Sequence, residues 1–414
     1  MPSIVKKNTT CLICGGKNLT KYLDLGQSAL ANSYVQEADL IKSDNTFPLR
    51  VYYCSDCHLA QLLDIVDRKI LFEDYAYFSS TSPQLLSYFE DYAKNVFVRF
   101  PKQTSKFTVE IASNDGILLK SFKNLGAKIL GVDPAKNVAQ EANSNGVPTL
   151  AKFFNKAIAQ EILNEYGHAG IITANNVLAH TDTLHEIMEG VKLLLDADGV
   201  FVFEVQYLGD LINKNEFDNT YHEHICYFSL APLKTLLKKH GLEIFDVEQV
   251  AGQGGSLRVF AGNIPLLHPT SGAVELLSKQ ESILGLDNLT TYQNFAERPK
   301  QTKKDLVKLL TDLKKSGKTI VGYGAPAKGN TLLQYCGIGP NLIDYVIDAS
   351  PSKQGRFTPG MHIPIFAPSK LKEVPPDYIL LLAWNYADSI IQKESWLKDL
   401  GVKFIKPVPE VTVL

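Results

Sequence analysis

The sequence lacks the features by which membrane proteins and nucleic-acid-binding proteins are recognised. No apolar run reaches the roughly 18 residues of a membrane helix, and the N-terminal segment has no apolar signal core. The 42 basic residues are balanced by 44 acidic ones, a formal net charge of −2, so no basic excess favours nucleic acid. We therefore expect a cytoplasmic protein that binds neither membranes nor nucleic acid.

Cysteine is scarce as well, with six among 414 residues, which is too few for a disulfide scaffold in a chain of this length. Four of the six form two Cys-x-x-Cys pairs on either side of a long loop: Cys11, Cys14, Cys54 and Cys57. Four thiolates suit tetrahedral Zn²⁺ and leave no coordination position open for water or substrate, so the predicted zinc is structural. Two unrelated surface pairs, or a redox pair, are the alternative.

What the sequence does contain is an alternation of short apolar runs with helix-like stretches. With 45% hydrophobic and 21% charged residues, the chain is typical of a globular protein of about three domains. From Phe107 onward, strand-like and helix-like segments alternate, which predicts an α/β fold with a parallel sheet covered on both faces. Ligands of such sheets bind at the carboxyl ends of the strands.

The first of these strands ends in a tight turn from Glu110 to Gly116, and the second ends in Asp133, where it can accept hydrogen bonds from a ribose. The turn has one glycine where a dinucleotide-binding loop has three. S-adenosylmethionine (SAM) has no phosphate and carries a sulfonium cation, which suits the two acids. We therefore predict SAM binding, with a dinucleotide or a ligand-free domain as alternatives. The candidate cofactor residues are Glu110, Ala112, Asn114, Gly116, Asp133, Asn175 and Asn176.

A cluster of acid–base groups follows the fifth strand at Tyr221, His222, Glu223 and His224. Because imidazole titrates near neutrality, this cluster indicates proton transfer. A polar loop that caps the next helix through Ser229 is the alternative.

Two further loops have the composition of ligand contacts. Gly254 and Gly255 let a backbone approach a ligand while Arg258 holds an anion, and a plain hairpin turn explains the same residues equally well. The segment that contains Tyr75 and Tyr77 is rich in hydroxyls and aromatic rings, which favours a sugar-facing loop or a linker.

A helical stretch then leads to a second α/β unit near the C-terminus. Its first turn combines Gly324 with Lys328 at the start of a helix, an arrangement that binds a diphosphate, and Asn330 and Arg356 complete the candidate anion site. The same turn, followed by Asp348, is compatible with a dinucleotide fingerprint, so NAD binding is the competing interpretation.

Taken in order, the double Cys-x-x-Cys, EIASNDG, YHEHICYFS, GGSLR and GYGAPAKGNTLL motifs resemble the sugar C-methyltransferase family, whose members act on nucleotide-linked 4-keto-deoxysugars. The resemblance covers essentially the whole chain. It implies a zinc-binding domain over 1–75, a seven-stranded Rossmann-like SAM-dependent methyltransferase domain over 76–265, a helical linker over 266–316, and a Rossmann-like nucleotide-sugar-binding domain over 317–414.

The resemblance also implies a reaction, the methylation of the sugar carbon next to the ketone through an enolate. The family's active-site positions fall on Tyr75, His180, Tyr221, Glu223 and His224. His224 is the expected base, Glu223 orients it and Tyr221 donates to the enolate oxygen, while Tyr77 contacts substrate. His222 is a second candidate base. Two rival functions are an NAD(P)-dependent sugar-nucleotide oxidoreductase and a zinc-stabilised binding module without catalysis.

Overall fold

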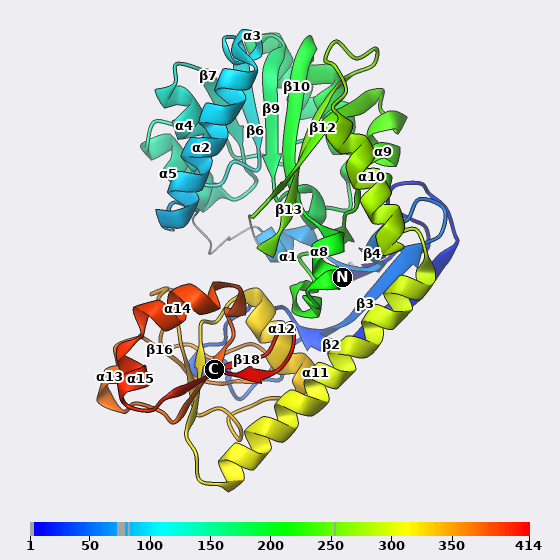
Figure 1. The fold of residues 1–414 in the computed structure, drawn as a ribbon. Helices are drawn as coiled ribbons and strands as arrows, with labels where there is room; N and C mark the ends of the chain where they lie inside the picture. The colour runs from blue at the N-terminus through cyan, green and yellow to red at the C-terminus, as the bar shows by residue number, and fades with distance from the viewer. Residues whose placement is uncertain (1–3, 73–78, 82, 252–253) are drawn as a thin grey trace.

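The computed structural model describes residues 4–72, 79–81, 83–251 and 254–414. Two α/β units lie one above the other, and a hairpin of β2 (Leu19–Ala29) and β3 (Thr46–Cys54) extends along the same side as the long helix α11 (Leu289–Lys315), as Figure 1 shows. Within the described ranges, no helix is both long and apolar enough to cross a membrane.

The N-terminal domain is built on a small antiparallel sheet. Leu49, Val51 and Tyr53 in β3 are buried in alternation, which is the period of a strand with one inward face. The sheet order is β11-β4-β3-β2, and β11 comes from the middle of the chain. The sheet therefore joins the first and second domains through main-chain hydrogen bonds. The other elements are β1 (Val5–Lys7), β4 (Ala60–Leu62), β5 (Asp64–Val66), α1 (Arg68–Phe72) and β11 (Cys226–Tyr227).

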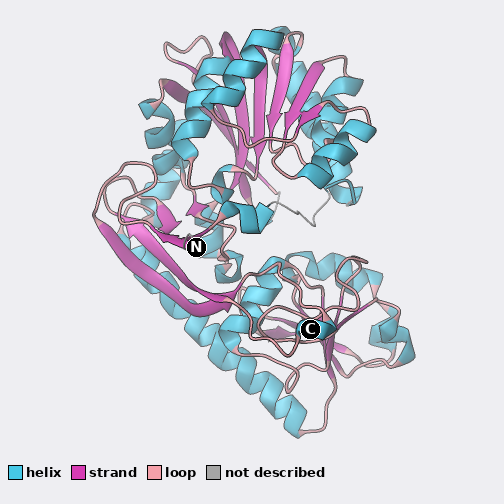
Figure 2. Ribbon diagram, turned by 180° about the vertical axis from the view of Figure 1, so that it is seen from behind, coloured by secondary structure: helices cyan, strands magenta, loops and turns pink. Residues whose placement is uncertain are grey.

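The middle domain has a seven-stranded sheet in the order β12-β13-β10-β9-β6-β7-β8. β13 is antiparallel to both neighbours, and the other strand pairs are parallel. β6 is buried at every position, as a central parallel strand should be, and helices lie on both faces (Figure 2). The prediction of a seven-stranded Rossmann-like fold is confirmed.

The strands of this domain are β6 (Phe107–Ile111), β7 (Lys128–Val132), β8 (Thr149–Leu150), β9 (Ala169–Asn175), β10 (Leu195–Gln206), β12 (Leu242–Val250) and β13 (Ser256–Asn263). Its helices are α2 (Pro83–Arg99), α3 (Pro101–Thr104), α4 (Ile117–Asn124), α5 (Lys136–Ser144), α6 (Lys156–Tyr166), α7 (Leu184–Leu194), α8 (Leu208–Asn213) and α9 (Leu230–Lys239).

Two helices, α10 (Gly272–Leu284) and α11, connect this domain to the last one. α11 does not lie free in solvent, because its buried residues recur every three to four positions and pack on the N-terminal hairpin. Tyr292 contacts Tyr22 and Tyr53, with ring centroids 5.1 Å and 4.5 Å apart. The connection between the α/β units is therefore packed against the first domain.

The C-terminal domain is a second Rossmann-like unit. Its sheet has the order β16-β15-β14-β17-β18-β19, parallel except for β19. The elements are β14 (Ile320–Tyr323), α12 (Ala327–Cys336), β15 (Tyr345–Ile347), β16 (Ile365–Phe366), α13 (Lys370–Glu373), β17 (Tyr378–Leu381), α14 (Ala387–Lys393), α15 (Trp396–Asp399), β18 (Lys403–Lys406) and β19 (Thr412–Val413). The strand order places the carboxyl end of β14 at the switch point where such folds bind ligands.

Candidate active site

The four paired cysteines converge in the N-terminal domain. Their sulfur atoms all lie within 4.8 Å of one another, with 3.5 Å between Cys11 and Cys57 and 3.5 Å between Cys14 and Cys54. Zn–S bonds of about 2.3 Å in a tetrahedron separate the sulfurs by roughly 3.8 Å, so the cluster fits a zinc ion. Since cysteines fill all four positions, the zinc is structural.

The turn after β6 is shaped by hydrogen bonds to Asp133, the residue that follows β7. Its Oδ2 accepts from the Asn114 N–H at 2.9 Å, while the Ala112 N–H donates to Val132 O at 2.7 Å. Gly116, at φ +81°, directly precedes α4 as its N-cap, and a Cβ there would lie 2.7 Å from a methyl group of the neighbouring loop. The turn therefore requires glycine at this position.

Three buried carboxyls crowd this edge of the sheet: Glu110 and Asp115, each 4% exposed, and Asp133, 6% exposed. Burial raises the pKa of Glu110 well above its usual range, and the charges of Asp133 and Asp115 add to this effect. A cationic ligand relieves this repulsion, whereas a pyrophosphate adds to it. These three carboxyls therefore fit SAM, whose sulfonium and ammonium groups are positive, better than they fit a dinucleotide.

All of the predicted cofactor residues lie at this carboxyl edge. Asn175 is the last residue of β9, and the Asn176 N–H donates to Glu204 O at 2.9 Å. Asp115 was not among the residues predicted from the sequence, and its Oδ2 accepts from the Ser80 N–H at 3.0 Å. The sequence did contain a signal for it, because Asp115 is an additional acid within the predicted turn from Glu110 to Gly116. Tyr75 and Tyr77 lie outside the described residues.

The acid–base cluster lies at the same edge, because the Ile225 N–H donates to Ala179 O at 2.7 Å, in the 3₁₀ turn η3 (Leu178–His180) that follows β9. The rings of His180 and His224 are 4.9 Å apart. His224 Nδ1 lies 2.7 Å from Asn219 O, and its Nε2 lies 2.8 Å from the Tyr221 hydroxyl. Because a carbonyl only accepts, Nδ1 carries the proton and Tyr221 donates to Nε2.

The two candidate bases have different surroundings. His224 is half-buried beside Tyr221, whereas His222 is 2% exposed and packs edge-on against Phe47 of β3, with centroids 5.8 Å apart. Burial, assisted by His180 and Lys328, lowers the pKa of His224 to about 3, so the imidazole is neutral near pH 7. This geometry favours His224 over His222 as the proton acceptor.

Glu223 is 4% exposed, and its Oε1 accepts a 3.0 Å hydrogen bond from the side chain of Asn32. Asn32 belongs to the loop after β2, so the N-terminal domain reaches the acid–base cluster directly. Tyr34 of the same loop donates to Ala325 O in the C-terminal domain. Neither residue was predicted from the sequence, because neither lies in a recognisable motif.

Lys328 lies between the domains rather than in an open anion site. Its ammonium is 4.3 Å from the centre of the Trp384 ring and interacts electrostatically with Asp218 and Glu216 of the middle domain. Burial lowers the pKa of Lys328, and the negative charges of Asp218 and Glu216 partly oppose this effect. Its positive charge is thus already balanced within the protein.

The prediction that Arg258 holds a substrate anion needs correction. Arg258 is 5% exposed, and its Nε lies 2.8 Å from Glu204 Oε1, in an ion pair that joins β13 to β10. Tyr88 lies 3.2 Å from Nη2 and donates to the same Glu204 carboxylate. The guanidinium is thus already paired inside the domain, rather than placed in an open anion site.

The predicted loop glycines lie close to acidic side chains. A Cβ on Gly255 would lie 2.0 Å from Asp210 Oδ2, and one on Gly254 would lie 3.1 Å from Glu216 Oε2. Both have positive φ, so these positions require glycine through packing as well as conformation. They border α8, next to the interdomain cluster.

The remaining C-terminal candidates line the first turn of that domain and its neighbouring loop. Gly324 has φ +83°, with Ala383 2.9 Å from an added Cβ. Asn330 is fully buried and donates to Ala31 O at 2.8 Å, so it holds the N-terminal loop in place. Arg356 is half-buried. The Ala325 N–H donates to Asp348 Oδ2 at 2.7 Å, which removes one donor that a dinucleotide would use.

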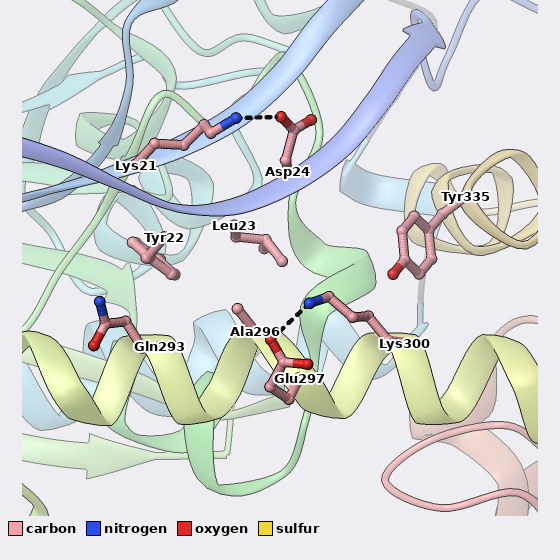
Figure 3. A pocket seen from close by; sticks show the side chains of 9 residues that line it. All are labelled: Lys21, Tyr22, Leu23, Asp24, Gln293, Ala296, Glu297, Lys300 and Tyr335. Atoms are coloured by element: carbon pink, nitrogen blue, oxygen red, sulfur yellow. Dashed lines mark hydrogen bonds and ion pairs between the residues drawn. The ribbon is translucent and has the colours of Figure 1, made fainter.

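A separate cavity of about 210 Å³ lies between β2 and α11 (Figure 3). It contains none of the predicted site residues, and its charged side chains pair within their own elements, Lys21 with Asp24 and Lys300 with Glu297, each at 2.6 Å. The residues that line it are Lys21, Tyr22, Leu23, Asp24, Gln293, Ala296, Glu297, Lys300 and Tyr335. This cavity lies away from the acid–base cluster.

The fold and the site together define a class I SAM-dependent methyltransferase with a structural zinc domain and a second Rossmann-like domain. Three family models match the chain in order: a zinc binding domain at residues 11–72, a methyltransferase domain at 86–247 and a C-methyltransferase C-terminal domain at 251–409. C-methyltransferase NovU of Streptomyces niveus is 36% identical over 414 residues, which span 100% of this chain and 99% of that protein. The chain belongs to the C-methyltransferase family, and it is a SAM-dependent C-methyltransferase.

Solved structures with similar folds include two methyltransferases. Magnesium protoporphyrin IX methyltransferase from Synechocystis PCC 6803 with bound SAM is 13% identical, with a TM-score of 0.32, over 47% of this chain and 88% of its own. A SAM-dependent methyltransferase from Anabaena variabilis ATCC 29413 is 13% identical, with a TM-score of 0.33, over 43% of this chain and 95% of its own.

Proposed function

We propose that this enzyme methylates the carbon next to the ketone of a keto-deoxysugar linked to a nucleoside diphosphate. The observation that carries the proposal is the half-buried imidazole of His224, with Nδ1 bonded to Asn219 O and Nε2 facing the Tyr221 hydroxyl. A carbon acid must lose its proton before the carbon can act as a nucleophile, so a neutral imidazole beside a phenol is suited to this step.

In this proposal, His224 Nε2 takes the proton from the sugar carbon, and the electron pair moves into the carbonyl to give an enolate. For this step the Tyr221 hydroxyl must turn from Nε2 to the enolate oxygen, which frees the lone pair of the base, and His180 is the second donor to that oxygen. Glu223 and Asn32 hold the turn that presents the base. SAM supplies an electrophilic methyl group, and the carboxyl edge of the seven-stranded sheet holds it. Because His224 has a low pKa and is a weak base, stabilisation of the enolate must supply much of the driving force.

The C-terminal domain is the proposed binding site for the nucleotide. Its Rossmann strand order, with the turn at Gly324, places backbone N–H groups at the start of α12. Arg356, on the loop before β16, is the proposed cation for the diphosphate. The pairing of Ala325 with Asp348 and the proline at the start of α12 argue against an NAD-dependent oxidoreductase.

A solvent-exchange assay tests the proposal. Nucleoside diphosphate 4-ketosugars are incubated with the enzyme in D₂O without methyl donor, and then with SAM, and mass spectrometry follows deuterium and methyl gain. The wild type should do both, and His224→Asn should slow both by about 10²- to 10⁴-fold while retaining SAM affinity. His185→Asn is the control, because His185 pairs with His240 at 2.7 Å, outside the cluster. Turnover of nicotinamide, or full activity of His224→Asn, would refute the proposal.

A further inference from the structure

The tautomer of His224 depends on a single backbone carbonyl. Asn219 O accepts from Nδ1 at 2.7 Å, and this leaves Nε2 as the lone-pair nitrogen. Asn219 is the last residue of a short 3₁₀ turn, η4 (Phe217–Asn219), all of it buried. The position of η4 therefore sets which nitrogen of His224 acts as the base and where that nitrogen lies.

The C-terminal domain holds η4 in place by two side-chain contacts and one electrostatic interaction. Trp384 Nε1 donates to Asp218 Oδ2 at 2.6 Å, and the Tyr335 ring lies 5.5 Å from that of Phe217. Lys328 adds a positive charge that faces Asp218, which is fully buried. From the middle domain, the Asn219 side chain donates to Glu216 Oε2 at 2.8 Å. The side chains of Phe217 and Asp218 thus have partners in the other α/β unit.

We propose that Trp384 is a positioning residue: by donating to Asp218 it fixes η4, and through the Asn219 carbonyl it sets the orientation and tautomer of His224. The proposal rests on the proposed function of His224 as the base. It makes the docking of the C-terminal domain a condition for a competent base in the middle domain. A purely structural Trp384 would affect stability and leave the imidazole of folded enzyme unchanged.

The chain offers a matched control, because its two tryptophans each donate Nε1–H to a carboxylate. Trp384 donates to Asp218, whereas Trp396 donates to Glu394 within the C-terminal domain at 3.0 Å. Trp384→Phe and Trp396→Phe each remove one donor and keep an aromatic ring. We expect Trp384→Phe to lower kcat by about tenfold or more while SAM affinity stays unchanged, and Trp396→Phe to leave kcat unchanged.

A second readout does not depend on the substrate. Long-range ¹H–¹⁵N spectra of enzyme labelled at histidine distinguish the two tautomers, and the signals missing in His224→Asn assign His224. Trp384→Phe should broaden or shift them toward the Nε2–H form, and Trp396→Phe should not. Asp218→Asn keeps an oxygen that accepts from Trp384 Nε1, so its histidine spectrum should match that of the wild type. This variant is the second measurement if Trp384→Phe does not fold.

Unchanged His224 signals in folded Trp384→Phe, or a shifted spectrum in Asp218→Asn while the Trp384 contact persists, would overturn the positioning role. Failure of the wild type to exchange or methylate any ketosugar nucleotide would instead overturn the proposed function. The spectra and the turnover assay thus separate the two failures.

Discussion

His222 and His224 are two positions apart and have opposite surroundings. Burial lowers the pKa of His222 to about 4, against 6.5 for the unfolded chain. At a pH between 4 and 6.5, the unfolded state binds more protons at His222 than the folded state does. The free energy of unfolding therefore falls as the pH drops from 6.5 toward 4. Two and a half pKa units correspond to about 3 kcal/mol.

His222→Gln should therefore be less acid-sensitive than the wild type. Urea unfolding at pH 7.5 and pH 5 measures the difference, and the loss of stability between the two should be smaller in the variant. Because the ring lies against Phe47 and away from the Tyr221–His224 pair, turnover per folded enzyme should persist. A variant that folds and loses turnover would show that His222, rather than His224, carries the proton.

Asn32 offers a second test at the scale of one side chain. Asn32→Ala removes the donor to the buried Glu223 carboxyl, so the folded state should lose about 1–3 kcal/mol, and turnover should fall with it. Asn18→Ala is the control, since Asn18 donates to Asp56 at 2.7 Å on the exposed surface and its loss should cost within about 0.5 kcal/mol. Equal losses in the two variants, by thermal unfolding, would argue against a role for Asn32 at the site.

At the scale of elements, the pair of Arg258 and Glu204 ties β13 to β10. Removing one partner of a buried ion pair leaves an uncompensated charge and costs about 3–5 kcal/mol. Arg258→Met should be destabilised by this amount, whereas Lys279→Met breaks an exposed pair with Glu275 and should cost about 0–1 kcal/mol. Because the Arg258 guanidinium is paired with Glu204 inside the domain, KM for the nucleotide sugar should be unchanged in folded Arg258→Met. A raised KM without loss of stability would restore the original anion-binding interpretation.

The same pair illustrates what could be predicted from the sequence. Local patterns succeeded: the doubled Cys-x-x-Cys, the alternation of strands and helices, and a one-glycine turn each depend on neighbouring residues, whose geometry the backbone dictates. The anion-binding interpretation of Arg258 missed its pairing with Glu204, because that partner lies on another strand, 54 positions away. An arginine beside glycines looks the same in sequence whether it meets a ligand or an internal acid.

At the scale of the molecule, the contacts that complete the proposed site join distant parts of the chain. Asn32 and Glu223 are 191 positions apart, and Trp384 and Asp218 are 166 apart. No periodicity or spacing encodes such contacts, because they arise only when three domains pack together. The acid–base cluster belongs to the middle domain, and the side chains that hold it come from the domains on either side.

Zinc removal tests this dependence across the whole protein. The Leu12 N–H in the first Cys-x-x-Cys pair donates to Gln61 Oε1 at 2.9 Å, and Gln61 pairs with Cys226 in the β4–β11 ladder. β11 begins two residues after His224, so one side-chain hydrogen bond, the β4–β11 ladder and a short stretch of chain connect the metal site to the base. Loss of zinc should loosen the Leu12–Gln61 hydrogen bond and the β4–β11 ladder.

Cys11→Ser should therefore bind less than one zinc ion per chain and lose most turnover, because the β4–β11 ladder no longer holds His224 in place. SAM affinity, measured by calorimetry, should be retained, since Glu110 in β6 and Asp133 directly after β7 belong to the seven-stranded domain, apart from the zinc-binding sheet. Cys336→Ser is the control: this buried thiol lies in α12, outside the metal cluster, and its loss should leave zinc content unchanged. A zinc-free Cys11→Ser enzyme with full turnover would mean that the middle domain positions its base without the zinc-binding sheet.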